Sequence, residues 1–124
     1  MIAERIKAQL RTGIPEYCVM QILRRGKVYA SDVIDELLEE DIIKVEGIIY
    51  PLLIRLKNEN LVQYEWTEAN SGLPKKHYHL TESGQNTIKA LDDTWAEISK
   101  SAKKIKKKTD DKLKEAKNES KDNI

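Results

Sequence analysis

The chain has 124 residues, of which 40 % are hydrophobic and 35 % are charged, and its formal net charge at pH 7 is +1. This length favours one domain with a modest core, and no apolar run approaches the roughly 18 residues that a membrane-spanning helix needs. Met1 leads into mixed charge rather than an apolar signal segment, and the single cysteine excludes an intramolecular disulfide, so we expect a cytoplasmic protein without membrane contact.

The first two predicted elements are short helices. Residues 2–11 are predicted to be helical because Ile2, Ile6 and Leu10 recur at a spacing of four. A second helix is predicted over residues 15–25, where a proline occupies the first turn and a glycine follows the last.

Two further helices are predicted before residue 60. Ser31 is a suitable N-cap for a helix over residues 32–40, whose first turn carries aspartates that favour a helix N-terminus. A fourth helix is predicted over residues 45–58, and Asn60 is expected to adopt the left-handed conformation that ends it. The apolar face of this fourth helix is formed by Ile49, Leu53 and Leu56.

The pattern then changes to that of a β-hairpin. Residues 61–67 and 76–80 alternate between apolar and polar side chains, as half-buried strands do. Asn70, Ser71, Gly72 and Pro74 are typical of a connecting loop. An isolated hairpin is only marginally stable in water, so this one must pack on the helices.

A long helix is predicted after Thr81, which is a suitable N-cap. Its apolar side chains recur at alternating spacings of three and four, which indicates a heptad seam. The seam is formed by Ile88, Leu91, Trp95, Ile98, Ala102 and Ile105. From about residue 110 the chain is rich in lysine and poor in large apolar residues, and we expect it to be frayed or disordered.

Charge is distributed unevenly along the chain. Residues 103–124 hold nine lysines and five acidic residues, a net charge of +4, so the rest of the chain carries a net charge of −3. If the body of the protein binds nucleic acid, it must do so through a local basic patch. The lysine run at 103–108 is either a solvated helix face or a source of nonspecific attraction to DNA.

The predicted fold is mainly α with a small β-hairpin. Three helices followed by a hairpin are typical of a winged helix-turn-helix domain, which we place at residues 1–81 with a first helix that contacts a second copy. Residues 82–109 form the C-terminal dimerisation helix, and residues 110–124 the tail. The predicted homodimer contacts are Ile6, Leu10, Ile88, Leu91, Trp95, Ile98, Ala102 and Ile105.

Two stretches of the chain carry specific motifs. GIIYPLLIRLKNENL, residues 47–61, follows the recognition-helix pattern G-T-L-Y-P-x-L-x-R-L-E-x-x-G-L, although Ile48 replaces threonine and Asn60 replaces glycine. GLPKKHYHLTESG, residues 72–84, follows the wing pattern G-x-P-R-[RK]-x-Y-x-L-T-x-x-G. Both motifs make the chain resemble the PadR family of winged-helix transcriptional regulators.

The resemblance implies a recognition helix in the DNA major groove, whose N-terminal residues contact bases, and a wing that contacts the backbone or minor groove. The predicted DNA-binding residues are Lys44, Val45, Glu46, Gly47, Tyr50, Lys75, Lys76 and His77. Alternatives remain for several of them. Tyr50 could instead pack on the hairpin, the two wing lysines could only add solubility, and Glu46 is more simply a helix cap. Arg55 is as suited to pairing with an acid as to contacting DNA.

The resemblance extends to the segment around Trp95 in the short, multidrug-binding branch of the family. It implies that the two Trp95 side chains of a dimer flank a pore in which planar aromatic compounds stack, and Asp92 would favour cationic ones. The predicted ligand-binding residues are Trp95, Asp92 and Ile98. Plain packing of Trp95 at the dimer interface is the alternative.

The sequence offers little for catalysis. It has no phosphate-binding glycine loop, and His77 and His79 share a strand face without a third metal ligand, so we expect no enzyme activity, cofactor or metal. Cys18 lies in an apolar helix and is either inert or a thiol sensor. We therefore expect a dimeric repressor of a pseudo-palindromic operator, relieved by a planar ligand. A winged-helix module used only for protein contacts is the rival hypothesis.

Overall fold

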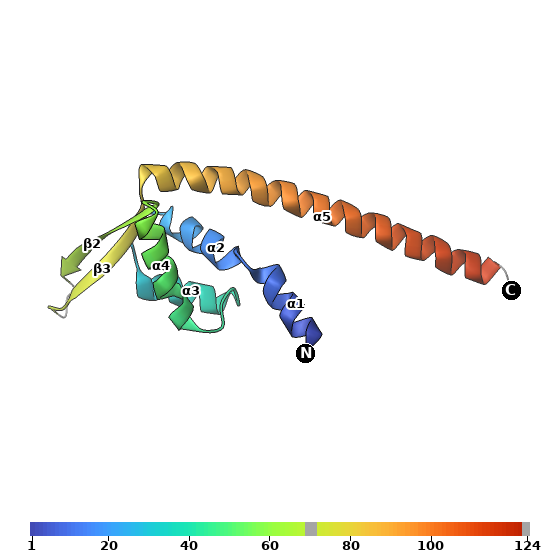
Figure 1. Ribbon diagram of the computed structural model, residues 1–124, viewed down its shortest axis with the longest axis horizontal. Helices are drawn as coiled ribbons and strands as arrows, with labels where there is room; N and C mark the ends of the chain where they lie inside the picture. Colours follow the sequence, from blue (N-terminus) through green and yellow to red (C-terminus); the bar gives the residue numbers. More distant parts are fainter. Residues whose placement is uncertain (69–71, 123–124) are drawn as a thin grey trace. The chain divides into compact units, whose positions relative to one another are not determined.

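The computed structural model describes residues 1–68 and 72–122 (Figure 1). The chain divides into two compact units, Met1–Lys89 and Ala90–Ile124, and each is described by itself. The first unit holds four α-helices and a small sheet, and the second continues the last helix. The predicted loop residues Asn70 and Ser71 lie outside the described residues.

Four α-helices precede the hairpin. They are α1 (Ile2–Arg11), α2 (Ile14–Leu23), α3 (Ala30–Glu39) and α4 (Ile49–Asn58). A short 3-10 turn, η1 (Glu46–Ile48), leads into α4. The prediction of α1 over residues 2–11 is confirmed, and Asn60 has the expected left-handed φ of 60°.

Three helix starts differ from the sequence predictions. That of α2 differs by only one residue, since the helix begins at Ile14 and ends at Leu23 instead of spanning residues 15–25. α3 begins at Ala30 instead of after a Ser31 cap, because the preceding Tyr29 is held extended, at ψ 148°, by its pairing with His77. The α-helical part of α4 begins at Ile49, four residues later than expected. Pro51 accounts for this, because its ring excludes a regular α-turn over the carbonyl of residue 47.

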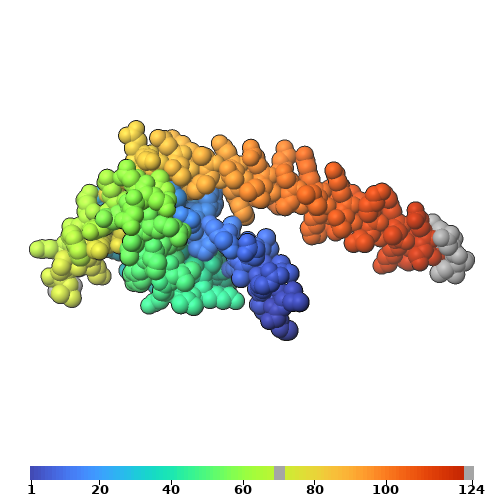
Figure 2. Space-filling model, in the orientation of Figure 1, coloured from blue at the N-terminus to red at the C-terminus, as the bar shows by residue number. Residues whose placement is uncertain are grey.

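The sheet has three antiparallel strands in the order β1-β3-β2. β2 (Val62–Glu68) and β3 (Pro74–Leu80) form the predicted hairpin, with Tyr64 opposite Tyr78. The sequence analysis missed β1 (Val28–Tyr29), which pairs with the other edge of β3. In the space-filling view the hairpin projects beyond the helices of its unit (Figure 2).

The core of the first unit lies between α2, α3, α4 and the sheet. Its fully buried side chains include Leu23, Val33, Leu37, Ile49, Leu53, Leu56 and Val62. Ile88 is also fully buried, so its assignment to the dimer seam is wrong. Heptad spacing marks an apolar helix face but does not show where that face is covered by its own chain.

The last helix, α5, runs from Glu82 to Asp122. Thr81 caps it as expected, since the backbone N–H of Gly84 donates to Thr81 Oγ1 at 2.9 Å. The helix continues through the segment that we expected to be frayed. Pairs spaced by four residues support it there, including Lys106 Nζ to Asp110 Oδ2 at 2.9 Å and Lys107 Nζ to Asp111 Oδ2 at 3.0 Å.

Candidate nucleic-acid interface

α4 presents two chemically different faces. Ile49, Leu52, Leu53 and Leu56 are buried in the core of the first unit. On the opposite side, Tyr50 is 50 % exposed and Ile54 is 61 % exposed. The sequence forms this helix because its buried side chains recur at spacings of three and four, and this periodicity leaves the other face open to solvent.

Two consecutive lysines on β3 bring positive charge to the hairpin. The Lys75 ammonium lies 5.5 Å from the centroid of the Tyr29 ring. The Lys76 ammonium lies 4.5 Å from the Tyr64 ring and 5.1 Å from the Trp66 ring. Aromatic ring faces attract cations without neutralising them, so the charges of both lysines remain available to an anion.

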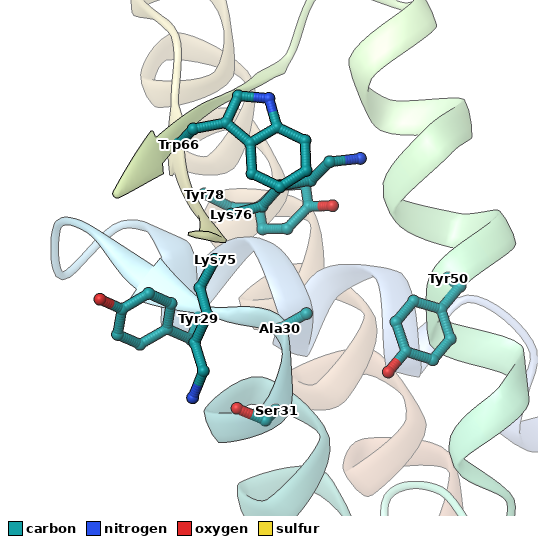
Figure 3. A pocket seen from close by; sticks show the side chains of 8 residues that line it. All are labelled: Tyr29, Ala30, Ser31, Tyr50, Trp66, Lys75, Lys76 and Tyr78. Atoms are coloured by element: carbon teal, nitrogen blue, oxygen red, sulfur yellow. The ribbon is translucent and has the colours of Figure 1, made fainter. Parts of the chain in front are cut away.

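A shallow hollow of about 290 Å³ joins the hairpin to the helices (Figure 3). It is lined by Tyr29, Ala30, Ser31, Tyr50, Trp66, Lys75, Lys76 and Tyr78. The figure shows Lys75 extending toward Ser31, while Tyr50 approaches from α4. The hollow therefore combines two ammonium groups with hydroxyl donors, which is the chemistry that binds phosphate oxygens.

The structure brings together only some of the predicted DNA-binding residues. Tyr50, Lys75 and Lys76 line one hollow. Lys44 lines a different one, of about 420 Å³, with residues of α1 such as Leu10. Val45, Glu46 and Gly47 are exposed in the segment that leads into α4. The predicted helix cap is not observed, because no side chain of the described residues, including that of Glu46, makes a capping hydrogen bond at the N-terminus of η1 or of α4.

The prediction that His77 contacts DNA is wrong. Its side chain is buried, with 5 % of the residue exposed, and Nδ1 lies 3.2 Å from Thr67 Oγ1. Nε2 lies 3.5 Å from Glu65 Oε2 but without hydrogen-bond geometry. Tyr78 and Leu80 point into the core, so His77 lies on the other face of β3, where it is covered by its neighbours Tyr29 on β1 and Thr67 and Glu65 on β2.

Arg55 is engaged by acidic side chains. Its Nη2 lies 3.2 Å from Glu16 Oε2, and its Nε lies 3.9 Å from Glu59 Oε1. Of the two roles left open by the sequence, the structure favours pairing within the protein. On the described part of α4, the exposed face near the N-terminal end thus carries a tyrosine and an isoleucine rather than an available cation.

A further ion pair joins the turn that follows α2 to α3. Arg25 Nη1 and Nη2 donate to the two carboxylate oxygens of Glu36 at 2.7 and 2.8 Å. These hydrogen bonds hold the pKa of Glu36 below its ordinary value. Cys18 lies nearby in a hollow with Arg25 and Glu36, and burial raises the pKa of its thiol, which favours the inert interpretation.

Sequence reasoning missed five residues of the hairpin hollow: Tyr29, Ala30, Ser31, Trp66 and Tyr78. The first three belong to β1 and the start of α3. A two-residue strand is too short to produce a detectable alternation, so the sequence held no signal for it. Trp66 was noted only as a strand residue, although an exposed aromatic beside two lysines is a signal for an interface.

The second unit carries the predicted ligand-binding residues on α5. Trp95 is 48 % exposed, and Ile98 is also exposed, while Leu91 and Asp92 are partly covered. Ile105 continues the exposed stripe. Among the described residues, no group of three histidine, cysteine or acidic side chains is placed to hold a metal ion. None of the described helices is long and apolar enough to cross a membrane.

Helices α2, α3 and α4, with a three-stranded sheet and a projecting hairpin that carries two consecutive lysines, define a winged-helix protein of the DNA-binding type. Residues 19–90, more than half of the chain, match the model of the transcriptional regulator PadR-like family. The chain therefore belongs to the PadR-like family, whose members are transcriptional regulators and not enzymes. No curated protein sequence matches it.

Several solved structures are similar. A PadR-like transcription factor from Bacteroides fragilis is 44 % identical, with a TM-score of 0.67, over 82 % of this chain and 98 % of that one. A PadR-like regulator from Bacillus cereus is 26 % identical, with a TM-score of 0.71, over 78 % of this chain and 95 % of that one. Bacillus subtilis PadR in complex with operator DNA is 25 % identical, with a TM-score of 0.58, over 64 % of this chain and 46 % of that one.

Proposed function

We propose that this chain is a homodimeric, cytoplasmic repressor that binds a pseudo-palindromic operator and is released by a planar aromatic ligand. The observation that carries the DNA-binding part is the hollow in which Tyr50 of α4 meets Lys75 and Lys76 of the hairpin. Winged-helix proteins place their recognition helix and their wing against one duplex, so both elements must present groups that suit DNA. The complex of the Bacillus subtilis relative with operator DNA supports the same use of this fold.

The phosphate-binding groups are arranged to hold the duplex in place. Lys75 and Lys76 attract backbone oxygens, and the hydroxyl groups of Tyr50 and Ser31 can donate to them. Residues 1–102 carry no net positive charge that would attract DNA, so backbone contact depends on local cations such as these two lysines. The segment 44–47 then lies at the end of α4 that enters the groove in such complexes.

The proposal of a homodimer rests on exposed apolar stripes. Every residue of α1 is exposed, and Ile6 and Leu10 lie on one face of it, with Leu10 80 % exposed. On α5, Trp95, Ile98 and Ile105 form another exposed stripe. A two-fold dimer buries the same stripe of both copies and matches the two half-sites of a palindrome.

The proposed ligand site involves Trp95 of both copies. A planar aromatic compound stacks on an indole ring, and the negative ring face favours a cationic compound. Asp92 lies one turn before Trp95 on α5, and Ile98 lies one turn after it. A ligand that binds one arrangement of the dimer better than another shifts the distance between the two DNA-binding units, and so lowers operator affinity.

A mobility-shift assay tests the DNA-binding function. Genomic fragments bound by the full chain are selected, and the best one is compared with random duplexes of equal length at 150 mM salt. We expect a specific affinity at least about 1,000-fold above the nonspecific one. Equal binding of all duplexes would overturn the proposal and favour the rival hypothesis, a winged-helix module that contacts only proteins.

A further inference from the structure

The exposed face of α4 is unusually apolar for a helix that contacts DNA bases. Tyr50 and Ile54 are four residues apart, so they lie on one side of the helix in successive turns. Pro51 is exposed beside them, and Gly47 precedes them by one turn. This face of the first two turns, Gly47, Tyr50, Pro51 and Ile54, is called the apolar face below.

The polar groups near this face are few and largely committed. Arg55 pairs with Glu16 and Glu59, and Lys57 extends toward the hairpin, 5.3 Å from the centroid of the Tyr64 ring, instead of toward Ile54. The bidentate contacts that distinguish guanine and adenine require arginine, lysine, asparagine or glutamine at the base edges. The apolar face instead offers an isoleucine side chain, an aromatic ring and one hydroxyl.

A single exposed isoleucine is common on protein surfaces and requires no explanation. The apolar face differs in its position, because Tyr50 also lines the hollow that holds Lys75 and Lys76. A duplex whose backbone meets those lysines brings its major groove to α4. Because the neighbouring hollow carries two lysines that attract phosphate groups, we take double-stranded DNA as the partner of the apolar face.

We propose that Ile54, supported by the ring of Tyr50, recognises thymine through its C5-methyl group in the major groove of each operator half-site. The inference rests on the proposed DNA-binding function and adds the specificity to it. Thymine is the base that presents an apolar group in the major groove. Contact between this methyl group and Ile54 removes apolar surface of both partners from water, and a base without the methyl group loses that gain.

The test removes only the methyl group. The tightest duplexes are selected from a random 26-base-pair library, and each is synthesised again with deoxyuridine in place of every thymidine. We expect the thymidine duplex to bind about fourfold tighter for each contacted methyl group, or about fifteenfold when each half-site contributes one. The affinity ratio of the two duplexes is the measured quantity, at one salt concentration.

Variants test whether Ile54 causes the difference in affinity between the thymidine and deoxyuridine duplexes. Ile54→Ala is expected to bring the ratio close to one, whereas Ile54→Val, which keeps a branched side chain, retains most of it. The matched control is Lys75→Ala, which removes a backbone contact and is expected to weaken both duplexes equally. Circular dichroism of each variant verifies the fold, which the exposed position of Ile54 should leave intact.

The possible outcomes are distinct. A ratio near one for the unmodified protein, or selected sites without an enriched thymine, overturns thymine recognition but leaves the regulator function standing. A large ratio that Ile54→Ala does not change overturns the assignment to Ile54. Failure to select any duplex above random sequence overturns the proposed function itself. A large ratio that collapses in Ile54→Ala and persists in Lys75→Ala supports the inference.

Discussion

Gly84, in the first turn of α5, lies against the carbonyl oxygen of Leu61 so closely that a Cβ atom at residue 84 would overlap it. The same oxygen accepts a hydrogen bond from the backbone N–H of Thr81 at 3.0 Å. Thr81 Oγ1 in turn donates to the carbonyl oxygen of Asn60 at 2.7 Å. These contacts join the end of β3 to the residues that follow α4, so the position of the hairpin depends on the absence of a side chain at Gly84.

The first prediction concerns this junction. Gly84→Ala is expected to destabilise the protein by about 1–3 kcal/mol, because the backbone must move to admit the methyl group. The melting temperature should fall by about 4–8 °C for each kcal/mol at a fixed protein concentration. Gly47→Ala is the matched control, since a Cβ atom there meets open space. Equal melting temperatures for the two variants would contradict the close approach.

The second prediction concerns the salt dependence of DNA binding. Lys75→Ala should weaken binding to all duplexes by a similar factor. The slope of log affinity against log salt concentration should become shallower by about 0.9 for each lost phosphate contact, or about 1.8 in a dimer. Lys89→Ala, an exposed lysine on α5, should leave the slope unchanged. An unchanged slope in Lys75→Ala would show that this lysine only adds solubility.

The third prediction concerns acid stability. Hydrogen bonds from Arg25 lower the pKa of Glu36 in the folded protein relative to the unfolded chain. The pair therefore stabilises the folded protein at pH values above the pKa of Glu36 in the unfolded chain. This stabilisation is lost as the pH falls through the lower pKa of the folded state. Glu36→Gln should therefore lower stability at pH 7, by less than about 1 kcal/mol because the pair is exposed to solvent.

The difference between Glu36→Gln and the unmodified protein should shrink as the pH falls below the ordinary glutamate pKa of about 4.3. It should disappear once the pH is below the lowered pKa of Glu36 in the folded state, because both side chains are then neutral. Denaturant unfolding between pH 3 and pH 7 measures it. Glu39→Gln, on the same helix, is the control for a general effect of charge. A difference that stays constant over this range would rule out the linkage to Glu36.

The fourth prediction concerns the homodimer. Leu10→Asp places a charge on the exposed apolar stripe of α1 and should shift the protein toward monomers in sedimentation velocity experiments. The monomer should keep its helix content, because every residue of α1 is exposed in a single copy. Gln9→Asp introduces the same charge off the stripe and should leave the dimer intact. A dimer that survives Leu10→Asp would exclude the stripe from the interface.

The fifth prediction concerns the proposed ligand. Planar cationic dyes should quench the tryptophan fluorescence of the dimer and release it from DNA. Trp95→Phe should abolish most of the quenching, whereas Trp66→Phe should retain it, and comparison of the two separates the α5 site from the hairpin. Quenching that persists in Trp95→Phe would place the dye elsewhere, beside Trp66.

The sequence predicted the elements whose periodicity extends over several turns. α1, α2, α3, α4, the hairpin and α5 were all expected, since repeated spacings of three, four or two identify a face of each. Asn60 and Thr81 were assigned from local chemistry, as a left-handed residue and a helix cap, and both assignments are confirmed. The end of α5 was missed because low hydropathy was taken as disorder, while ion pairs such as Lys106–Asp110 support a helix.

The candidate site was predicted less completely, because its residues are joined by tertiary contacts. Tyr50, Lys75 and Lys76 came from the family motifs, but Tyr29 joins them only through the pairing of β1 with β3. The same pairing buries His77, which alternation along β3 alone could not show. Ile88 was assigned to the dimer seam because spacing identifies an apolar face but not its partner.

The two faces of α4 have an evolutionary consequence. Side chains such as Leu53 and Leu56 are committed to the core, so drift at those positions is limited by stability. Tyr50 and Ile54 are exposed, and most substitutions of exposed residues cost little stability. A duplicated gene could therefore acquire a new set of target promoters through one or two codon changes in α4 while the rest of the fold is inherited unchanged.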